Sequence, residues 1–137
     1  MAEFLTDDWL NSFKEKLNKD SKYAEIAKNW EGDIKLRIEP GKDLAEPVTV
    51  YLDLWHGKCR DAYFLENGKE MDAAFAMNGK YEDYLRILTG DLHPMQAMLT
   101  RKLHVQGNMA LMMRNVPTVL DFVRCAQEVT EVTEIAQ

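Results

Sequence analysis

The sequence contains few of the residues from which catalytic and metal centres are built. Its 137 residues include two cysteines and three histidines, and its only serines are Ser12 and Ser21. It has neither the Gly-x-Ser-x-Gly motif of serine hydrolases nor a glycine-rich phosphate-binding loop. One spacing typical of metal ligands joins His56 to Cys59, but a second pair to complete four ligands is missing. The sequence therefore predicts neither a catalytic residue nor a bound metal or cofactor.

Targeting and membrane-spanning segments are also missing from the sequence. No apolar run approaches the roughly 20 residues that a transmembrane helix needs. The first residues, Met-Ala-Glu-Phe-Leu-Thr-Asp-Asp, lack the basic start and apolar run of a signal peptide. The last residues, Thr-Glu-Ile-Ala-Gln, are not a Ser-Lys-Leu type address. We therefore expect a cytoplasmic protein without integral membrane contact, in which Cys59 and Cys125 are reduced thiols.

The sequence also lacks an excess of basic residues. The net charge is −6 and the isoelectric point is near 5.1. This balance argues against nucleic-acid binding and against a polybasic membrane-binding surface. The sequence is 46% hydrophobic and 29% charged, which is typical of a globular protein. Its length predicts one domain over residues 1–137, with a core at about 6–128 and an acidic tail at 129–137.

Hydrophobic periodicity predicts the secondary structure. Strands with one polar face are expected at about 32–39, 48–55, 59–66, 73–77 and 103–107. Helices are expected at about 6–19, 21–30, 80–89, 94–102 and from 109 onward. Pro117 either kinks the last helix or starts another, and we expect Val116, Leu120 and Val123 to continue the face set by Met109. Because antiparallel sheets tolerate one polar face, we predict an α+β fold. In it, helices cover one face of a five-stranded, mostly antiparallel sheet.

The segment from residue 90 to 116 holds five of the eight methionines, namely Met95, Met98, Met109, Met112 and Met113. Methionines commonly fill irregular gaps in a core. Five of them would specify a core poorly, but would form a tolerant wall around a ligand of variable shape. From the residues alone, both interpretations stay open.

The same segment contains a longer pattern. It reads Gly-x-x-x-Pro-x-x-Ala, then a basic pair, then Leu-x-Val-x-Gly-Asn-Met, at positions 90, 94, 97, 101, 102, 103, 105, 107, 108 and 109. It resembles the signature region of the sterol carrier protein family (SCP-2-type) of non-specific lipid-binding domains. The order of elements is similar over about residues 20–116. The resemblance implies an apolar tunnel between sheet and helices. Without a peroxisomal signal, the chain looks like a prokaryotic, stand-alone member.

The resemblance also implies a function: non-catalytic binding and transport of an apolar lipid. The ligand would be a fatty acid, acyl-CoA, isoprenoid or sterol. The tunnel wall is then expected to include Met77, Leu88, Leu92, Met95, Met98, Leu99, Met109, Met112, Met113, Val116 and Leu120. A kink at Pro117 would let the last helix act as a lid. The alternative is an accessory or scaffold module that presents a hydrophobic intermediate to a partner enzyme, and an enzyme of unknown type is the third hypothesis.

The polar face of the sheet offers one further candidate surface. Trp55 shares a side of its strand with Tyr51 and Asp53. If that side is uncovered, it forms an exposed aromatic patch suited to homodimerisation or to docking of a partner. If the hairpin or an N-terminal helix covers it, the aromatic residues are ordinary packing. The sequence leaves both possibilities open.

Overall fold

The computed structural model describes residues 3–66, 69 and 71–130. Two helices come first, α1 (Asp7–Lys19) and α2 (Ser21–Ile26). Four strands follow, β1 (Ile34–Glu39), β2 (Val48–Trp55), β3 (Lys58–Leu65) and β4 (Phe75–Lys80). The remaining elements are α3 (Tyr81–Leu88), α4 (Pro94–Leu99), β5 (Leu103–Gly107), α5 (Met109–Arg114) and α6 (Val116–Val129). All five predicted strands are present, in the predicted order. Within the described ranges, no helix combines the length and hydropathy needed to cross a membrane.

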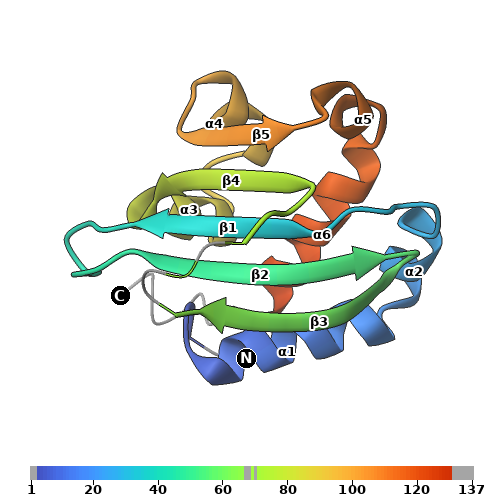
Figure 1. Ribbon diagram of the computed structural model, residues 1–137, viewed down its shortest axis with the longest axis horizontal. Coiled ribbons are helices and arrows are strands. Elements are labelled where there is room, and N and C mark those ends of the chain that lie inside the picture. The colour runs from blue at the N-terminus through green and yellow to red at the C-terminus, as the bar shows by residue number, and fades with distance from the viewer. Residues whose placement is uncertain (1–2, 67–68, 70, 131–137) are drawn as a thin grey trace.

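The five strands form one sheet in the order β3-β2-β1-β4-β5. Neighbours are antiparallel except β1 and β4, which run parallel. Figure 1 shows α1, α3 and α6 on one side of this sheet. The register places Leu36 opposite Val50 and Met77, and Met77 opposite Val105, so that apolar side chains form rows facing the helices. The predicted α+β fold with a mostly antiparallel sheet is confirmed.

Helix α1 forms where the sequence predicts an amphipathic helix. The hydroxyl of Thr6 accepts a hydrogen bond from the backbone N–H of Trp9 at 3.1 Å and so caps the helix. Its apolar face, consisting of Trp9, Leu10, Phe13 and Leu17, is buried. Burial of each such side chain contributes about 2 kcal/mol. The indole N–H of Trp9 also donates to the Thr130 hydroxyl at 2.8 Å, which ties α1 to the end of α6.

The end of α6 corrects the predicted boundary of the tail. We expected an acidic tail from residue 129, but Val129 and Thr130 are both buried in the fold. The rest of that predicted tail, residues 131–137, lies outside the described residues.

A break at Asn115 separates α5 from α6. Asn115 has φ −120° and ψ 33°, outside the helical range, and Pro117 lies in the first turn of α6. At that position the missing N–H of proline has no effect, because the first N–H groups of a helix are unpaired anyway. Pro117 therefore starts a second helix. Our expectation of a continuous face through Val116, Leu120 and Val123 was wrong, because the break resets the helical phase. The buried residues of α6 are instead Thr118, Val119, Asp121, Cys125, Ala126 and Val129.

Residues 71–74 of the connection between β3 and β4 cross the outer face of the sheet, as Figure 1 shows. The Lys35 ammonium donates to the backbone carbonyl of Met71 at 2.9 Å, and the Tyr63 hydroxyl contacts the Met71 sulfur at 3.4 Å. Beneath this connection Tyr51 is buried, whereas Trp55 is 39% exposed. The outer face is thus partly covered by residues that lead into β4. We had considered an uncovered face, or cover by the hairpin or an N-terminal helix, but not this segment. Homodimerisation through this face stays a prediction.

Candidate functional site

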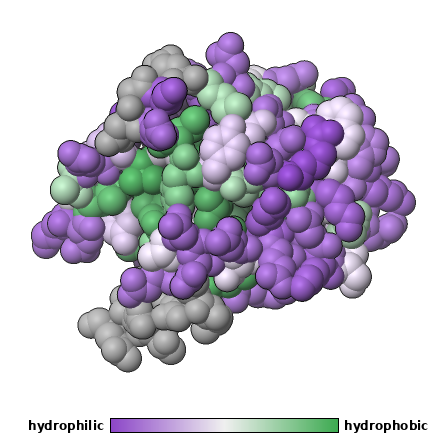
Figure 2. All heavy atoms as spheres, turned by 60° about the horizontal axis from the view of Figure 1, so that its bottom comes forward, coloured by the Kyte–Doolittle hydropathy of each residue, from purple (hydrophilic) through white to green (hydrophobic). Residues whose placement is uncertain are grey.

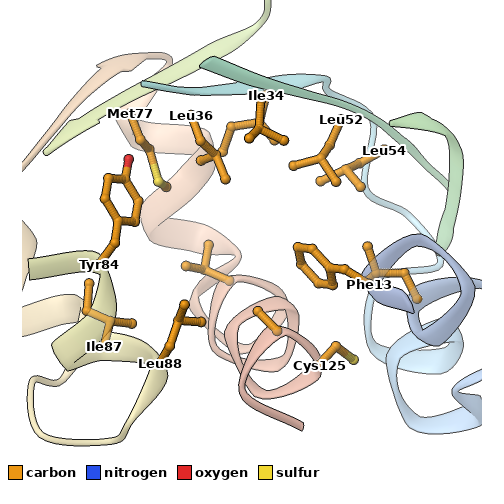
Figure 3. Packing of buried hydrophobic residues seen from close by; sticks show 14 of the residues in the cluster. Phe13, Ile34, Leu36, Leu52, Leu54, Met77, Tyr84, Ile87, Leu88 and Cys125 are labelled. Atoms are coloured by element: carbon orange, nitrogen blue, oxygen red, sulfur yellow. The ribbon is translucent and has the colours of Figure 1, made fainter. Parts of the chain in front are cut away.

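The space between sheet and helices contains an apolar cavity of about 70 Å³. Figure 3 shows Leu36 and Met77 pointing from the sheet toward this space, and Tyr84, Ile87 and Leu88 approaching from α3. The lining comes from α1, α3, α4, α6, the sheet and the N-terminal turn. It consists of Phe4, Trp9, Phe13, Leu36, Met77, Tyr84, Ile87, Leu88, Pro94, Met98, Leu103, Val119, Phe122, Val123 and Ala126.

A second cavity of about 30 Å³ adjoins the first. It is lined by Tyr23, Trp30, Ile34, Leu54, Met77, Met112, Thr118, Val119 and Phe122. Three side chains, those of Met77, Val119 and Phe122, line both cavities and form the partition between them. Ligand pockets are typically about 300–1,000 Å³. The expected tunnel is therefore represented by two small cavities that must join and widen before they can hold an acyl chain.

The polar atoms of the larger cavity's lining are already engaged elsewhere. The Trp9 indole N–H is bound to Thr130, and the Tyr84 hydroxyl donates to the Arg37 carbonyl at 3.4 Å. Burial raises the pKa of Tyr84 above its ordinary value, so its hydroxyl stays neutral. Among the described residues that line either cavity, none is charged. The site therefore favours an apolar group and offers nothing that would recognise a charged headgroup.

Helices α4 and α5 are short parts of the wall that bury few side chains. Each has only six residues. Helix α4 buries Pro94 and Ala97, and α5 buries only Met112. Segments with few buried apolar contacts have low local unfolding free energies. The preceding turn contains Gly90, whose φ of +83° is readily adopted by glycine. A ligand that separates these helices from the sheet displaces little packing.

Four of the eleven predicted wall residues line a cavity. Met77, Leu88 and Met98 line the larger one, while Met77 and Met112 line the smaller one. Leu92 is buried in the core. Met95, Val116 and Leu120 are half-buried and line neither cavity.

The other three predicted wall residues lie on the surface. The exposed fraction is 78% for Leu99, 53% for Met113 and 39% for Met109. We had assigned them to inward faces by assuming long helices. A helix of six residues completes fewer than two turns, so it can direct only one or two side chains inward. A role of any of the eleven in ligand binding stays a prediction.

Most of the α6 side of the wall was not predicted from the sequence. Val119, Phe122, Val123 and Ala126 follow the i, i+3, i+4, i+7 spacing of one helical face. A helix begun at Pro117 would have revealed this face. Phe4, Trp9 and Phe13 at the N-terminus were also not assigned to the site, although a helix at about 6–19 was predicted.

One of the three histidines has a structural role, and the other two lie on the surface. His93 caps α4, because its Nδ1 accepts a hydrogen bond from the Met95 N–H at 3.1 Å. His56 lies 2.6 Å from a Glu31 carboxylate oxygen on the surface. His104 is exposed on β5, opposite Asn78.

Cys59 and Cys125 are free, buried thiols. Burial raises the pKa of Cys59 to about 12 and that of Cys125 to about 11. Because the thiolate is the reactive form, both side chains are inert near neutral pH.

One group of potential metal ligands exists among the described residues, formed by Asp20, Asp121 and Cys125 within 4.8 Å of one another. Its carboxylates are already bound by Arg124, at 2.6 Å to Asp20 and 2.8 Å to Asp121. This guanidinium holds the pKa of Asp20 well below its usual range. Lys16 adds a contact of 3.1 Å to Asp20. The cluster is therefore an ion-pair network that joins α1 and α2 to α6.

A wider groove of about 770 Å³ lies on the surface beside the N-terminal turn. It is lined by Leu5, Thr6, Asp7, Leu44, Ala45, Glu46, Pro47, Val48, Phe64 and Leu65. Figure 2, which brings the lower side of Figure 1 forward, shows a patch of apolar side chains on an otherwise polar surface. The groove is open to solvent and carries two acidic side chains. It cannot exclude water from an apolar ligand as the internal cavities do.

The sequence and the fold of the chain are similar to those of known proteins. The model of the SCP-2 sterol transfer family matches residues 10–119. A crystal structure of sterol carrier protein 2 is 30% identical with a TM-score of 0.84, covering 93% of this chain and all of that one. A possible sterol carrier protein from Thermus thermophilus is also 30% identical, with a TM-score of 0.83, covering 94% and 91%. This likeness agrees with the prokaryotic origin expected from the sequence.

At 19% identity, an Aedes aegypti sterol carrier protein in complex with the C16 fatty acid palmitate shares the fold, with a TM-score of 0.55. The match covers 87% of this chain and 94% of that one. None of the curated proteins matches the chain.

Proposed function

Since the chain belongs to the SCP-2 sterol transfer family, we propose that it binds and carries an apolar lipid between its sheet and helices without catalysing a reaction. The observation that carries this proposal is the pair of adjoining cavities, lined by uncharged side chains and divided only by Met77, Val119 and Phe122. The ligand class is a fatty acyl, isoprenoid or sterol-like group.

Burial of the lipid chain supplies the free energy that opens the site. Each buried methylene contributes about 0.8 kcal/mol, so about 14 methylenes gain roughly 11 kcal/mol. Opening about 200 Å³ of additional space at about 24 cal/mol per Å³ costs roughly 5 kcal/mol. The gain exceeds the opening cost, and it grows with chain length. A linear chain long enough to span both cavities is therefore favoured over a short one.

The relative from Aedes aegypti that binds palmitate supports this ligand class, although it shares only the fold with this chain. The absence of charge in the described lining argues that the carboxylate or other headgroup stays at the surface. The inert thiols and the capping role of His93 support a non-catalytic role.

The experiment that tests the proposal is a chain-length series. Protein purified under non-denaturing conditions is analysed by native mass spectrometry for bound lipid, and saturated fatty acids are titrated against a bound fluorescent fatty acid. After the opening cost is subtracted, two methylenes gain about 0.9 kcal/mol, so we expect Kd to fall about fourfold for each two methylenes added, until the site is filled. No co-purifying lipid together with no displacement by any chain length would overturn the proposal.

A second candidate is the accessory or scaffold module, and the small size of the cavities favours it. Under this hypothesis the protein holds free lipid weakly and presents an intermediate to one enzyme. Reproducible recovery of a single enzyme in a pull-down, with a weak and length-independent fatty acid affinity, would support it over the carrier.

A further inference from the structure

Acidic residues are absent from one long segment of this acidic protein. Residues 92–120 contain Arg101, Lys102 and Arg114 but neither aspartate nor glutamate. All 23 acidic residues therefore lie outside this segment, and the net charge of the whole chain is −6. The segment begins before α4 and runs through β5 and α5 into α6. Figure 1 shows α4, β5 and α5 together at one edge of the sheet.

The same edge exposes apolar side chains. Of the four large hydrophobic residues that are exposed in the described part of the chain, three belong to it, namely Leu99, Met109 and Met113. The fourth, Trp55, is stacked beneath the Arg60 guanidinium, whose carbon lies 4.7 Å from the ring centroid. Exposed apolar residues beside unbalanced positive charge set this edge apart from the rest of the described surface.

The basic side chains of the edge have no carboxylate partners among the described residues. Each of the other four arginines, Arg37, Arg60, Arg86 and Arg124, forms an ion pair. None of the ion pairs found within residues 3–66, 69 and 71–130 involves Arg101, Lys102 or Arg114. Arg101 moreover has a φ of +61°, a conformation that is unfavourable for residues other than glycine.

Local structure explains most of the pattern at residues 90–109 but not its basic pair. Gly90 and Gly107 have φ values of +83° and +136°. Pro94 begins α4, and Asn108 caps α5 through a hydrogen bond of 3.0 Å from the Leu111 N–H. Arg101 and Lys102 are exposed, and neither donates a side-chain hydrogen bond among those found for the described residues. Both side chains are therefore available to a partner outside the chain.

The edge is also the outer side of the cavity wall. Met98 lines the larger cavity and its neighbour Leu99 is exposed. Met112 lines the smaller cavity and its neighbour Met113 is exposed. A partner bound to the exposed side would therefore lie one helix away from the lipid site.

The net charge of −6 argued against a polybasic membrane-binding surface, but it averages over the whole chain, and this edge carries three basic residues and no acidic one. We propose that this edge, formed by α4, β5 and α5, docks the protein on an anionic lipid bilayer. The proposal rests on the lipid-binding function proposed above and names the surface at which lipid is exchanged. Basic side chains near an anionic membrane gain attraction, and neighbouring apolar side chains insert among the lipid headgroups. The apolar side chains are spread over two short helices rather than gathered in a groove. Such an arrangement suits a deformable bilayer better than a rigid protein surface.

Docking also orients the molecule. The acidic remainder of the chain is repelled by an anionic bilayer, so the basic edge turns toward the membrane. In that orientation α4 and α5 face the lipids, and their separation from the sheet opens the cavities toward the bilayer. The lipid chain then passes from membrane to cavity without crossing water.

The test is co-sedimentation of the full chain with vesicles. The vesicles contain phosphatidylcholine alone or phosphatidylcholine with about 30% phosphatidylglycerol, at about 50 mM and about 500 mM salt. We expect binding to the anionic vesicles only, and its loss at high salt. Lys102→Glu should weaken the partition about 25-fold, because each unit of charge near the surface is worth about fivefold. Leu99→Glu should weaken it similarly, and Lys28→Glu, a charge reversal outside this edge, should change it least.

Arg101→Gly separates docking from folding. Glycine relieves the left-handed backbone conformation, so the variant should unfold at a higher temperature while its partition to anionic vesicles falls about fivefold. A purely structural role for Arg101 would not move the two measurements in opposite directions. Titration with a fluorescent fatty acid in the absence of vesicles should give the wild-type Kd for Lys102→Glu, Arg101→Gly and Lys28→Glu, none of which changes a predicted wall residue. This readout distinguishes a failure of docking from a failure of lipid binding.

The proposal is overturned if anionic vesicles do not bind the wild-type protein. It is also overturned if binding occurs but is equally strong in Lys102→Glu, Leu99→Glu and Lys28→Glu. Loss of a protein partner in the edge variants, without any vesicle binding by the wild type, would assign the edge to a protein instead.

Discussion

Replacing Phe122 by alanine should weaken the fold and strengthen lipid binding, because this ring fills the partition between the two cavities. Phe122 lines both cavities, and its ring centroid lies 5.0 Å from that of Phe13. Truncation of a buried phenylalanine to alanine destabilises proteins by about 3–5 kcal/mol. Since Phe122 is half-buried, we expect the free energy of unfolding to fall by about 3 kcal/mol, the lower end of that range.

The same substitution should favour the lipid complex. Loss of the ring leaves roughly 100 Å³ of new space, which the wild-type protein must open at about 24 cal/mol per Å³, or roughly 2 kcal/mol. In the variant this space is already open, and it joins the cavities of about 70 and about 30 Å³. We therefore expect the Kd for a fluorescent fatty acid to fall about 30-fold.

The assay pairs urea unfolding, which gives the free energy of unfolding, with equilibrium titration of the fluorescent fatty acid. Phe64→Ala is the matched control, because Phe64 is also a half-buried phenylalanine but lines neither cavity. The control should lose stability and keep its Kd. If Phe122→Ala instead weakens binding, or leaves Kd unchanged as the control does, the cavities do not lie on the path of the lipid and the reasoning is refuted.

Three further predictions follow from packing and ionisation. Arg124→Ala should lower the free energy of unfolding by about 1–3 kcal/mol, as measured by urea unfolding, because the buried Asp121 loses its closest cation while Asp20 keeps Lys16. Because Arg124 lowers the pKa of Asp20, that pairing stabilises the protein above the ordinary aspartate pKa and is lost as pH falls through the lowered one. The variant should therefore lose less stability on acidification. Gly107→Ala should destabilise by about 1–3 kcal/mol, because φ is +136° and the new Cβ would lie 2.6 Å from a backbone carbonyl oxygen. Thermal unfolding checks this, with no loss in Tm as the contradicting result. With pKa values of about 12 and about 11, Cys59 and Cys125 should resist iodoacetamide at pH 8 in native protein and react after unfolding, as measured by mass spectrometry.

The sheet could be predicted from the sequence because each strand packs one face against the helices. Ile34, Leu36 and Ile38 alternate with polar residues and are buried as the pattern indicates. The parallel pairing of β1 with β4 could not be predicted. It depends on how the connection after β3 crosses the outer face, which is set by contacts such as that between Lys35 and Met71 rather than by periodicity.

The cavity wall was harder to predict, because the face of a helix depends on where that helix starts. Asn115 interrupts the methionine-rich pattern, so Met113 points outward while Val119 and Phe122 point inward. Local composition identified the segment that forms part of the wall. It could not identify the contribution of Trp9 and Phe13, because that contact depends on the packing of α1 against α6.

The hydrogen bond between Trp9 and Thr130, which joins residues 121 positions apart, has a consequence for motion. Fraying usually begins at chain ends, and each end opens independently of the other. Here α1 and the end of α6 share this bond and the wall of the larger cavity, so opening one exposes the other. Amide hydrogens in both helices should therefore exchange with solvent at similar rates. A lipid in the cavity should slow the exchange of both helices together, although they are formed from opposite ends of the sequence.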